Sequence, residues 1–398
     1  MDTNAYPSPL AHLDDASAAF LQRIVASARD YLGAHVSFVA EVDDQAEIIR
    51  ISAGPAASAG VSVGTCFDAT ETYCHLMLQG RLPEAIYDTR YDARVRDIPL
   101  TSRLGIESYM GVPVVLPDGR VLGTLCCINF PSDPERRTRD LAFMRFLAGL
   151  VGDQLDESQR AHDLRMQRYD AIDAVLRSGG PHIVFQPMMS LDGRGAIGVE
   201  ALARFDSPVN ATPDVWFREA WAVDLGVDLE LAAVRNALPV LDRLPAEMFL
   251  SLNISPDTVA RAEFAEAIAH VDPTRLVIEI TEHAAVDDYA PLLAAARRLR
   301  DAGVRIAIDD VGAGYASLRH VLRLGPDIAK LDMSLTRSVD GDPVKQALAS
   351  GMMAFAARTG VTVVAEGVET AAEADALRDA GVRYAQGFLF GAPGNASR

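Results

Sequence analysis

The stretch RIAIDD, residues 305–310, is an apolar run that ends in two adjacent aspartates, and the glycine-containing turn VGAGY (311–315) follows it. Apolar runs without alternation are typical of strands in a sheet that is covered on both faces. Such runs recur after Gly180, with helical stretches such as 289–303 and 343–360 between them. The strand candidates are 182–187, 196–202, 248–255, 275–281, 305–310, 328–332, 362–366 and 384–390. Eight strand-and-helix units predict a TIM-type α/β barrel in preference to an open doubly wound sheet.

Polar residues stand at the ends of these runs, where a barrel places its active site. In a barrel the C-terminal ends of the strands meet at one mouth. A buried carboxylate without a partner is costly, so a ring of them requires a cation. Oxygen donors without His or Cys favour Mg²⁺, Mn²⁺ or Ca²⁺ over zinc or copper. The residues concerned are Glu200, Asn253, Glu279, Asp309, Asp310, Lys330, Asp332, Glu366 and Gln386.

This many carboxylates exceeds what one divalent ion needs, and adjacent aspartates suit two ions that share a ligand. Two metals roughly 3.5–4 Å apart activate water and stabilise displacement at phosphorus. Lys330 is expected to hold the attacking water or to neutralise developing charge, and Arg204 to pair with a phosphate oxygen. A single acid at a strand end is usually a loop cap, but seven coincident strand ends reverse that expectation. The sequence therefore predicts a metal-dependent phosphodiester hydrolase.

Two other patterns receive structural interpretations. GAGYAS (312–317) resembles part of a dinucleotide-binding fingerprint, but the two carboxylates before it would repel a phosphate, so dinucleotide binding is disfavoured. Met352, Met353 and Phe355 are interpreted as ordinary core residues.

Charge and composition exclude several classes of partner. The formal net charge of −18 argues against sequence-independent binding to nucleic acid or to anionic membranes. The N-terminus has early acids and no apolar signal region, and no apolar run is long enough to span a bilayer, so we expect a cytoplasmic protein. Four cysteines (Cys66, Cys74, Cys126, Cys127) lack CxxC spacing and indicate neither a zinc site nor a disulfide framework.

The first third of the chain predicts a separate α/β domain around an antiparallel sheet. Strand-like runs are 37–43, 47–54, 84–90, 109–116 and 121–130, and residues 117–119 (Pro-Asp-Gly) predict a hairpin turn. Residues 156–180 have no proline and end in a double glycine, which predicts a continuous helical connector. We expect boundaries at 1–155, 156–178 and 179–398.

The second half resembles the EAL domain family. GVEALARF (198–205), SLNIS (251–255), IEITE (278–282), DDVGAGYASL (309–318), KLD (330–332), AEGVET (365–370) and QGFLF (386–390) match that family's motifs in order over roughly residues 165 to 398. The resemblance implies a TIM-like barrel with one antiparallel strand. It also implies hydrolysis of cyclic di-GMP to linear pGpG with two Mg²⁺ or Mn²⁺ ions.

The resemblance also assigns roles to individual residues. It implies one metal held by Glu200, Asn253, Glu279 and Asp309, and a second held by Asp309, Asp310 and Glu366. The expected catalytic residues are Lys330, which would contact the hydrolytic water, with Glu366 and Glu200. Substrate contacts are implied for Gln186, Arg204 and Gln386, a loop-anchoring role for Glu282 and a supporting role for Asp332.

An active phosphodiesterase is the leading hypothesis, because the ligand set is complete. The alternative is a catalytically silent EAL domain that acts as a cyclic di-GMP receptor. Its support is Val311 and Ala313, which replace the Phe and Thr usual in the DDFGTG loop.

The N-terminal part, roughly residues 15 to 155, resembles a GAF domain in GTCFDATETYC (64–74), YMGVPVVL (109–116) and VLGTLCCINF (121–130). GAF domains bind cyclic nucleotides, haem, bilins or other small molecules, or only dimerise. Cys74-His75 is similar to a bilin-holding pair but falls on an early helix, so a buried helix cysteine is favoured, and Cys126 and Cys127 are expected on a core strand. The combined hypothesis is a homodimeric enzyme whose GAF domain, with a ligand that the sequence does not identify, regulates the EAL domain through the helix.

Overall fold

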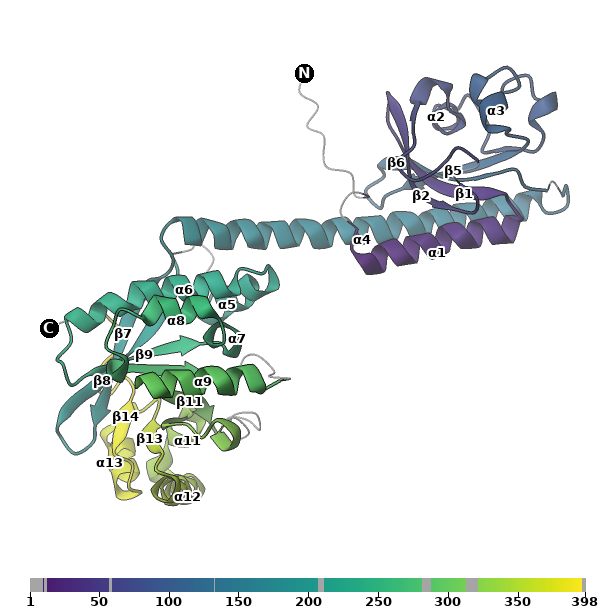
Figure 1. The fold of residues 1–398 in the computed structure, drawn as a ribbon. Helices are drawn as coiled ribbons and strands as arrows, with labels where there is room; N and C mark the ends of the chain where they lie inside the picture. Colours follow the sequence, from purple (N-terminus) through teal and green to yellow (C-terminus); the bar gives the residue numbers. More distant parts are fainter. Residues whose placement is uncertain are drawn as a thin grey trace. The chain divides into compact units, whose positions relative to one another are not determined.

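The structure is a computed structural model that describes residues 10, 13–56, 59–131, 133–206, 211–280, 288–312 and 321–395. The chain divides into two compact units, Met1–Met166 and Gln167–Arg398 (Figure 1). Among the described residues, no helix is both long enough and apolar enough to cross a membrane.

The first unit is built on an antiparallel sheet with the strand order β3-β2-β1-β6-β5-β4. Along β2, buried residues alternate with half-exposed ones, because successive side chains of a strand point to opposite faces of the sheet. The predicted hairpin joins β5 to β6, and Gly119 in its turn has a φ of +88°. The strands are β1 (Val36–Val42), β2 (Ala46–Ala53), β3 (Cys66–Asp68), β4 (Ala85–Ile86), β5 (Tyr109–Val115) and β6 (Val121–Ile128).

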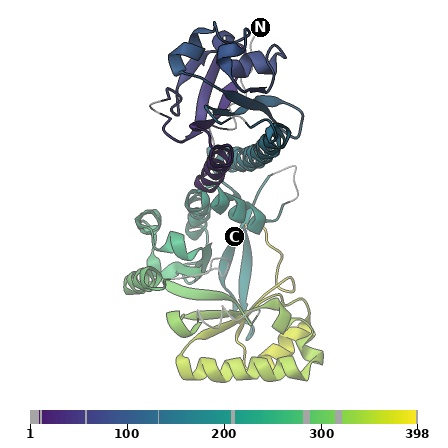
Figure 2. The same ribbon diagram turned by 90° about the vertical axis from the view of Figure 1, so that its right-hand side faces the viewer.

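Helices cover both faces of this sheet, which gives the unit two separate apolar cores. Helix α1 (Asp15–Leu32) and the first part of α4 (Arg137–Arg177) pack on one face. Helices α2 (Tyr73–Leu78) and α3 (Pro99–Leu104) pack on the other (Figures 1 and 2). The unit also contains two short 3₁₀ turns, η2 (Ala69–Glu71) and η3 (Thr89–Tyr91).

The predicted burial of Cys74, Cys126 and Cys127 is confirmed. Cys74 lies in α2 and is buried, and Cys126 and Cys127 on β6 are fully buried. Cys66 at the start of β3 is exposed.

Helix α4 is continuous over its 41 residues and includes residues 156–177 of the stretch predicted to be helical. It ends before Gly179 and Gly180, whose φ angles of +102° and +89° lie in the left-handed region that glycine adopts most easily. In the second unit Ile172 of α4 is fully buried against α5 (Pro213–Ala222) and α6 (Gly226–Ala237). The domain boundaries at residues 155 and 178 stay a prediction.

The second unit contains the predicted barrel. Eight strands close in the order β10-β11-β12-β13-β14-β7-β8-β9, and β7 runs antiparallel to both of its neighbours. The other neighbouring pairs are parallel. The strands are β7 (His182–Ser190), β8 (Gly195–Arg204), β9 (Phe249–Ile254), β10 (Leu276–Ile280), β11 (Arg305–Val311), β12 (Ile328–Leu331), β13 (Thr362–Ala365) and β14 (Tyr384–Gln386).

Amphipathic helices surround the barrel. In α9, Leu292, Ala295, Ala296 and Leu299 follow helical spacing and face the main core, which supports the 3.6-residue interpretation of that stretch. Met352, Met353 and Phe355 of α12 pack partly buried against the cores, as predicted. The described elements outside the barrel also include η4 (Leu238–Asp242), α7 (Pro256–Val259), α8 (Ala262–Ile268), η5 (Pro273–Arg275), α9 (Ala290–Ala302), α11 (Met333–Thr336), η6 (Val339–Gly341), α12 (Pro343–Thr359) and α13 (Ala371–Asp379).

Candidate functional site

The site lies directly above an apolar layer in the barrel interior. Val277, Ala307, Ile328 and Val364 belong to one interior cluster, each on a different parallel strand. Successive strand residues alternate sides, so the residue two positions later on each strand returns to the interior. Those residues are Glu279, Asp309, Lys330 and Glu366, the last directly after β13. Because side chains alternate sides along a strand, the ends of these four strands together form one polar layer inside the barrel.

Lys330 is the centre of this layer. Its side chain is about 1% exposed, and its Nζ atom lies 2.6 Å from Glu279 Oε2 and 2.6 Å from Glu366 Oε1. The same atom lies 3.2 Å from Glu200 Oε2 and 3.3 Å from Asp309 Oδ1. Burial disfavours the ammonium, but these four carboxylates outweigh it and raise the pKa of Lys330 well above its usual range. Lys330 is therefore a fixed positive charge.

Glu200 on β8 is held by side-chain amides from β9 and β14. Asn253 donates from Nδ2 to Glu200 Oε1 at 2.6 Å, and Gln386 donates from Nε2 to Glu200 Oε2 at 2.7 Å. Gln386 also donates to Gln186 Oε1 at 3.0 Å, and Gln186 donates in turn to the Gly391 carbonyl at 3.1 Å. Asn253 and Gln386 thus bind the Glu200 carboxylate directly, and Gln186 is connected to it through Gln386.

Glu279 is the most deeply buried acid of the site, with no exposed surface. Ser251 donates from Oγ to Glu279 Oε1 at 2.5 Å. Burial and the negative charge of Glu200 raise the pKa of Glu279 to about 8, although Lys330 opposes the rise. The main cause is removal of the carboxylate from water, and the neighbouring negative charge adds to it.

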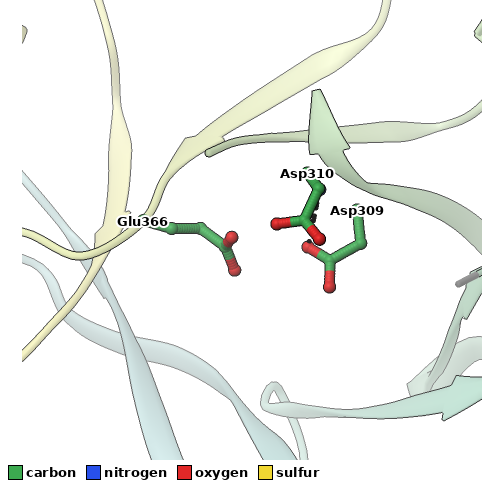
Figure 3. Close-up of side chains that lie close together, drawn as sticks. All are labelled: Asp309, Asp310 and Glu366. Atoms are coloured by element: carbon green, nitrogen blue, oxygen red, sulfur yellow. Dashed lines mark hydrogen bonds between the residues drawn. The ribbon is translucent and has the colours of Figure 1, made fainter. Parts of the chain in front are cut away.

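Asp309, Asp310 and Glu366 form the part of the site that could hold a metal. One carboxylate oxygen from each lies within 4.8 Å of the other two, and all three side chains are half-buried. Figure 3 shows the carboxylates of Asp309 and Asp310 at the end of β11 with that of Glu366 across from them. Burial raises the pKa of Glu366 well above its usual range, against the effect of Lys330.

The backbone turn that brings the two aspartates together starts earlier than the glycines. Asp310 itself has a φ of +54°, and the pairing of β11 with β12 shifts register between Ile308 and Val311. This bulge lets adjacent residues face one site although strand neighbours normally point apart. Gly312 continues the turn with a φ of +109°, and a Cβ there would meet Leu335 Cδ1 at 2.2 Å.

The charges of the layer fit divalent cations. Five carboxylates, from Glu200, Glu279, Asp309, Asp310 and Glu366, face one described ammonium, Lys330. Lys330 cannot neutralise them all. Burial raises the pKa values of Glu279 and Glu366, and repulsion from the neighbouring carboxylates adds to the rise. The donors are oxygens, which suits Mg²⁺ or Mn²⁺.

Other predicted residues lie apart from this layer. Arg204 at the end of β8 is exposed, and its Nη1 donates to the Ala203 carbonyl at 2.8 Å. Asp332 caps α11 by accepting from the Ser334 amide at 2.9 Å. Val311 is buried in the main core. Glu282 and Ala313 lie outside the described residues.

Sequence reasoning missed two residues that position the ligands. Ser251 lies two residues before Asn253, and a small polar residue in the run FLSLNI was an available signal. Glu230 of α6 is buried and accepts hydrogen bonds from the Ser255 amide at 3.1 Å and the Ser255 hydroxyl at 2.9 Å, which fixes the chain after β9. No local pattern distinguishes Glu230 from a surface acid of a helix.

Comparison with known proteins adds family matches for both units. A family model described as EAL domain matches residues 169–393, and one described as GAF domain matches residues 18–155. An uncharacterized protein of Mycobacterium tuberculosis is 30% identical over 280 residues, covering 66% of this chain and 45% of that protein. The cyclic di-GMP phosphodiesterase RocR of Pseudomonas aeruginosa is 31% identical over 232 residues, covering 55% of this chain and 58% of RocR.

Solved structures match the barrel. The MucR phosphodiesterase of Pseudomonas aeruginosa in complex with c-di-GMP is 29% identical, with a TM-score of 0.52, covering 58% of this chain and 98% of that one. An EAL domain protein of Listeria monocytogenes is 26% identical with a TM-score of 0.51, covering 56% of this chain and 92% of that one.

Proposed function

Because the chain belongs to the EAL domain family over residues 169–393 and carries a GAF domain over residues 18–155, we propose that it hydrolyses cyclic di-GMP to linear pGpG with two bound divalent cations. The observation that carries the proposal is the layer in which Asp309, Asp310 and Glu366 lie together beside Lys330. RocR is named a cyclic di-GMP phosphodiesterase, and the MucR phosphodiesterase structure is a complex with c-di-GMP. Both names support cyclic di-GMP as the proposed substrate.

The proposed ligand sets follow the sequence prediction. Glu200, Asn253, Glu279 and Asp309 would hold one Mg²⁺ or Mn²⁺ ion, and Asp309, Asp310 and Glu366 the other. When bound, the ions supply Lewis-acid activation of water and of the phosphorus centre. Asp309 belongs to both sets, and the bulge at Asp310 supports that assignment because it turns two neighbouring carboxylates to one side.

The chain's own residues contribute position and charge. Lys330 is proposed to donate a hydrogen bond to the attacking water and to stabilise negative charge that develops on the phosphate. Its four carboxylate neighbours fix its position and keep it charged. Gln186, Gln386 and Arg204 are proposed to contact the substrate, while Glu282 and Asp332 would support the loop and the start of α11.

The first unit is proposed to regulate the second. Helix α4 belongs to both units without a break, which supports transmission through that helix. We further propose domains at 1–155, 156–178 and 179–398, a homodimer, and action in the cytoplasm. The chain spans about half the length of the curated relatives it matches, so these remain proposals.

The experiment that tests the activity is incubation of the full chain with cyclic di-GMP and Mg²⁺ or Mn²⁺, followed by chromatography for pGpG. We expect turnover in wild type and a loss of at least about 100-fold in Glu200→Ala and Lys330→Ala while the circular dichroism spectrum is kept. Glu369→Gln, an exposed acid three residues after Glu366, is the matched control and is expected to retain activity.

The alternative of a silent receptor has a distinct outcome. Tight binding of cyclic di-GMP without turnover by either ion would favour the receptor over the enzyme. Val311 does not favour it, because its side chain is buried in the core and not in the acidic layer. Wild-type rates in Glu200→Ala or Lys330→Ala would contradict the site assignment itself.

A further inference from the structure

Two cysteines of the first unit meet in its interior. Cys74 on α2 and Cys126 on β6 are 52 positions apart in the chain, and their Sγ atoms lie 3.2 Å apart. Both side chains are buried, at 2% and 0% exposure. The helix and the central strand of the sheet thus present their thiols to each other.

Hydroxyl groups lie beside the pair within an otherwise apolar core, and a glycine leaves room for one of the sulfurs. Tyr109 Oη lies 3.8 Å from each Sγ atom, and Cys126 Sγ lies 3.2 Å from Thr124 Oγ1. Gly111 on the neighbouring strand faces Cys126, and a Cβ at Gly111 would come within 2.9 Å of that sulfur. Gly111 therefore leaves the space that Tyr109 Oη and Cys126 Sγ occupy.

A carboxyl group borders the same region. Glu47 on β2 is 3% exposed, its Oε2 atom has no hydrogen-bond partner among the described residues, and it lines a small cavity with Cys74 and Tyr109. The Cys74 thiol lies within hydrogen-bonding reach of this carboxyl group. Glu47 thus places an ionisable carboxyl group beside the pair.

We propose that Cys74 and Cys126 are a reversible oxidation site, at which a hydroperoxide converts the two thiols into a disulfide. Cys74 sulfur attacks the peroxide, forms a sulfenic acid and releases water when the oxidant is hydrogen peroxide. Cys126 sulfur then attacks the sulfenic sulfur, the S–S bond forms, and the hydroxyl leaves as a second water. The peroxide gains the two electrons that the thiols lose, and a small thiol reverses the change.

The geometry needed for the bond is almost present. A disulfide requires sulfurs about 2.0 Å apart, so the pair must close by roughly 1.2 Å. Helix α2 packs on the sheet through buried side chains, so the approach of the sulfurs and the entry of peroxide require local opening of this helix. Burial raises the pKa of the Cys74 thiol, so oxidation is expected to require such opening and to be slower than modification of exposed Cys66.

The test uses the full chain with Cys66→Ser, which removes the exposed thiol. Protein is treated with hydrogen peroxide, remaining thiols are alkylated after denaturation, and the peptides are analysed by mass spectrometry without reduction. We expect a cross-link between the peptide of Cys74 and the peptide of residues 121–136, with the loss of two hydrogens, and its disappearance after dithiothreitol.

Cys126 and Cys127 provide a matched pair of control variants. Both are fully buried and adjacent on β6, but Cys127 faces the other core and contacts Met144 Sδ at 3.9 Å. The cross-link should persist in Cys127→Ala and be lost in Cys126→Ala, with Cys126→Ser as a second variant if the alanine change prevents folding. Persistence in Cys126→Ala, loss in Cys127→Ala, or a cross-link only in unfolded protein would overturn the proposal.

Discussion

The barrel interior and the interior of the N-terminal sheet both bury carboxyl groups among apolar side chains, but they stabilise them differently. In the barrel, Glu200, Glu279 and Glu366 share Lys330 and a set of amide and hydroxyl donors. In the sheet, Glu47 forms no ion pair with Lys or Arg among the described residues. Its neighbours are the Thr72 hydroxyl and the Cys74 thiol.

The barrel interior contains a layer of several charged groups, whereas the sheet interior contains a single buried acid. An arrangement of five carboxylates around one ammonium remains negative and has a use for added cations. An isolated carboxyl group in apolar surroundings instead keeps its proton, because burial raises its pKa. The comparison predicts that removal of a buried charged group strongly lowers the free energy of unfolding of the barrel. Removal of Glu47 should instead raise that of the sheet by a small amount.

Removal of Lys330 is expected to have the largest effect. Lys330→Met leaves four carboxylates without their shared ammonium, and breaking a buried pair on one side costs about 3–5 kcal/mol. The free energy of unfolding of the barrel can be measured by denaturant titration of tryptophan fluorescence. Both tryptophans, Trp216 and Trp221, lie in the second unit.

The control for Lys330 is Lys345→Met on α12, whose exposed Nζ donates to the Arg337 carbonyl at 2.8 Å. It should change the free energy of unfolding by less than about 1 kcal/mol. Equal effects of the two variants would mean that the carboxylate layer does not depend on Lys330.

Divalent cations are expected to stabilise the barrel and leave the sheet unchanged. At a Mg²⁺ or Mn²⁺ concentration about 100 times its dissociation constant, the free energy of unfolding should rise by about 2.7 kcal/mol. Removal with EDTA should reverse the gain. Asp310→Asn should reduce it, because Asp310 is one of three acids within 4.8 Å of one another, whereas Asp301→Asn on the exposed face of α9 should not.

Hydrogen exchange with mass spectrometry checks both units in the same sample. Added cation should slow exchange in the peptides of β10 and β11 but not in those of β2 and β6. Equal protection of both units would break the distinction between the two interiors.

Two fully buried serines each donate one hydrogen bond, one in each interior, so the contributions of these two bonds to stability can be compared. Ser251 donates to the Glu279 carboxyl group at 2.5 Å, and Ser37 donates to the Val25 carbonyl at 2.6 Å. Bonds to charged acceptors contribute more, so at pH 9, above the pKa of about 8 of Glu279, Ser251→Ala should cost about 2 kcal/mol and Ser37→Ala about 1 kcal/mol. Tryptophan fluorescence measures the first and hydrogen exchange of β1 the second. A larger loss for Ser37→Ala would contradict the charged character of the barrel layer.

The sequence predicted the barrel and the acidic layer because both depend on local patterns. Unbroken apolar runs mark the strands, and the polar residue at each strand end is visible without any coordinates. Contacts between distant segments were not predictable in this way. Glu230 reaches Ser255 only because α6 packs beside the end of β9, and the left-handed Asp310 depends on a register shift against β12. The proximity of Cys74 and Cys126 likewise follows from how α2 covers the sheet.

Replacement of Glu47 is expected to have the smallest effect and the opposite sign. Burial raises the pKa of Glu47 above its usual range, so the folded state binds its proton more tightly than the unfolded state. The favourable contribution of this protonation is fully present below the unfolded pKa of about 4.5 and is lost as pH rises through the folded value. Glu47→Met removes the ionisable group and should stabilise the first unit at pH 8 by about 1 kcal/mol, with less gain at pH 4.5. Hydrogen exchange of the β2 peptide at the two pH values, corrected for intrinsic rates, measures the difference.

Glu41→Met is the control, because Glu41 pairs with Arg50 at 2.7 Å and its loss should not stabilise the sheet. A gain from Glu41→Met, or a gain from Glu47→Met that is larger at pH 4.5, would show that burial of an unpaired carboxyl group does not set the balance in this interior.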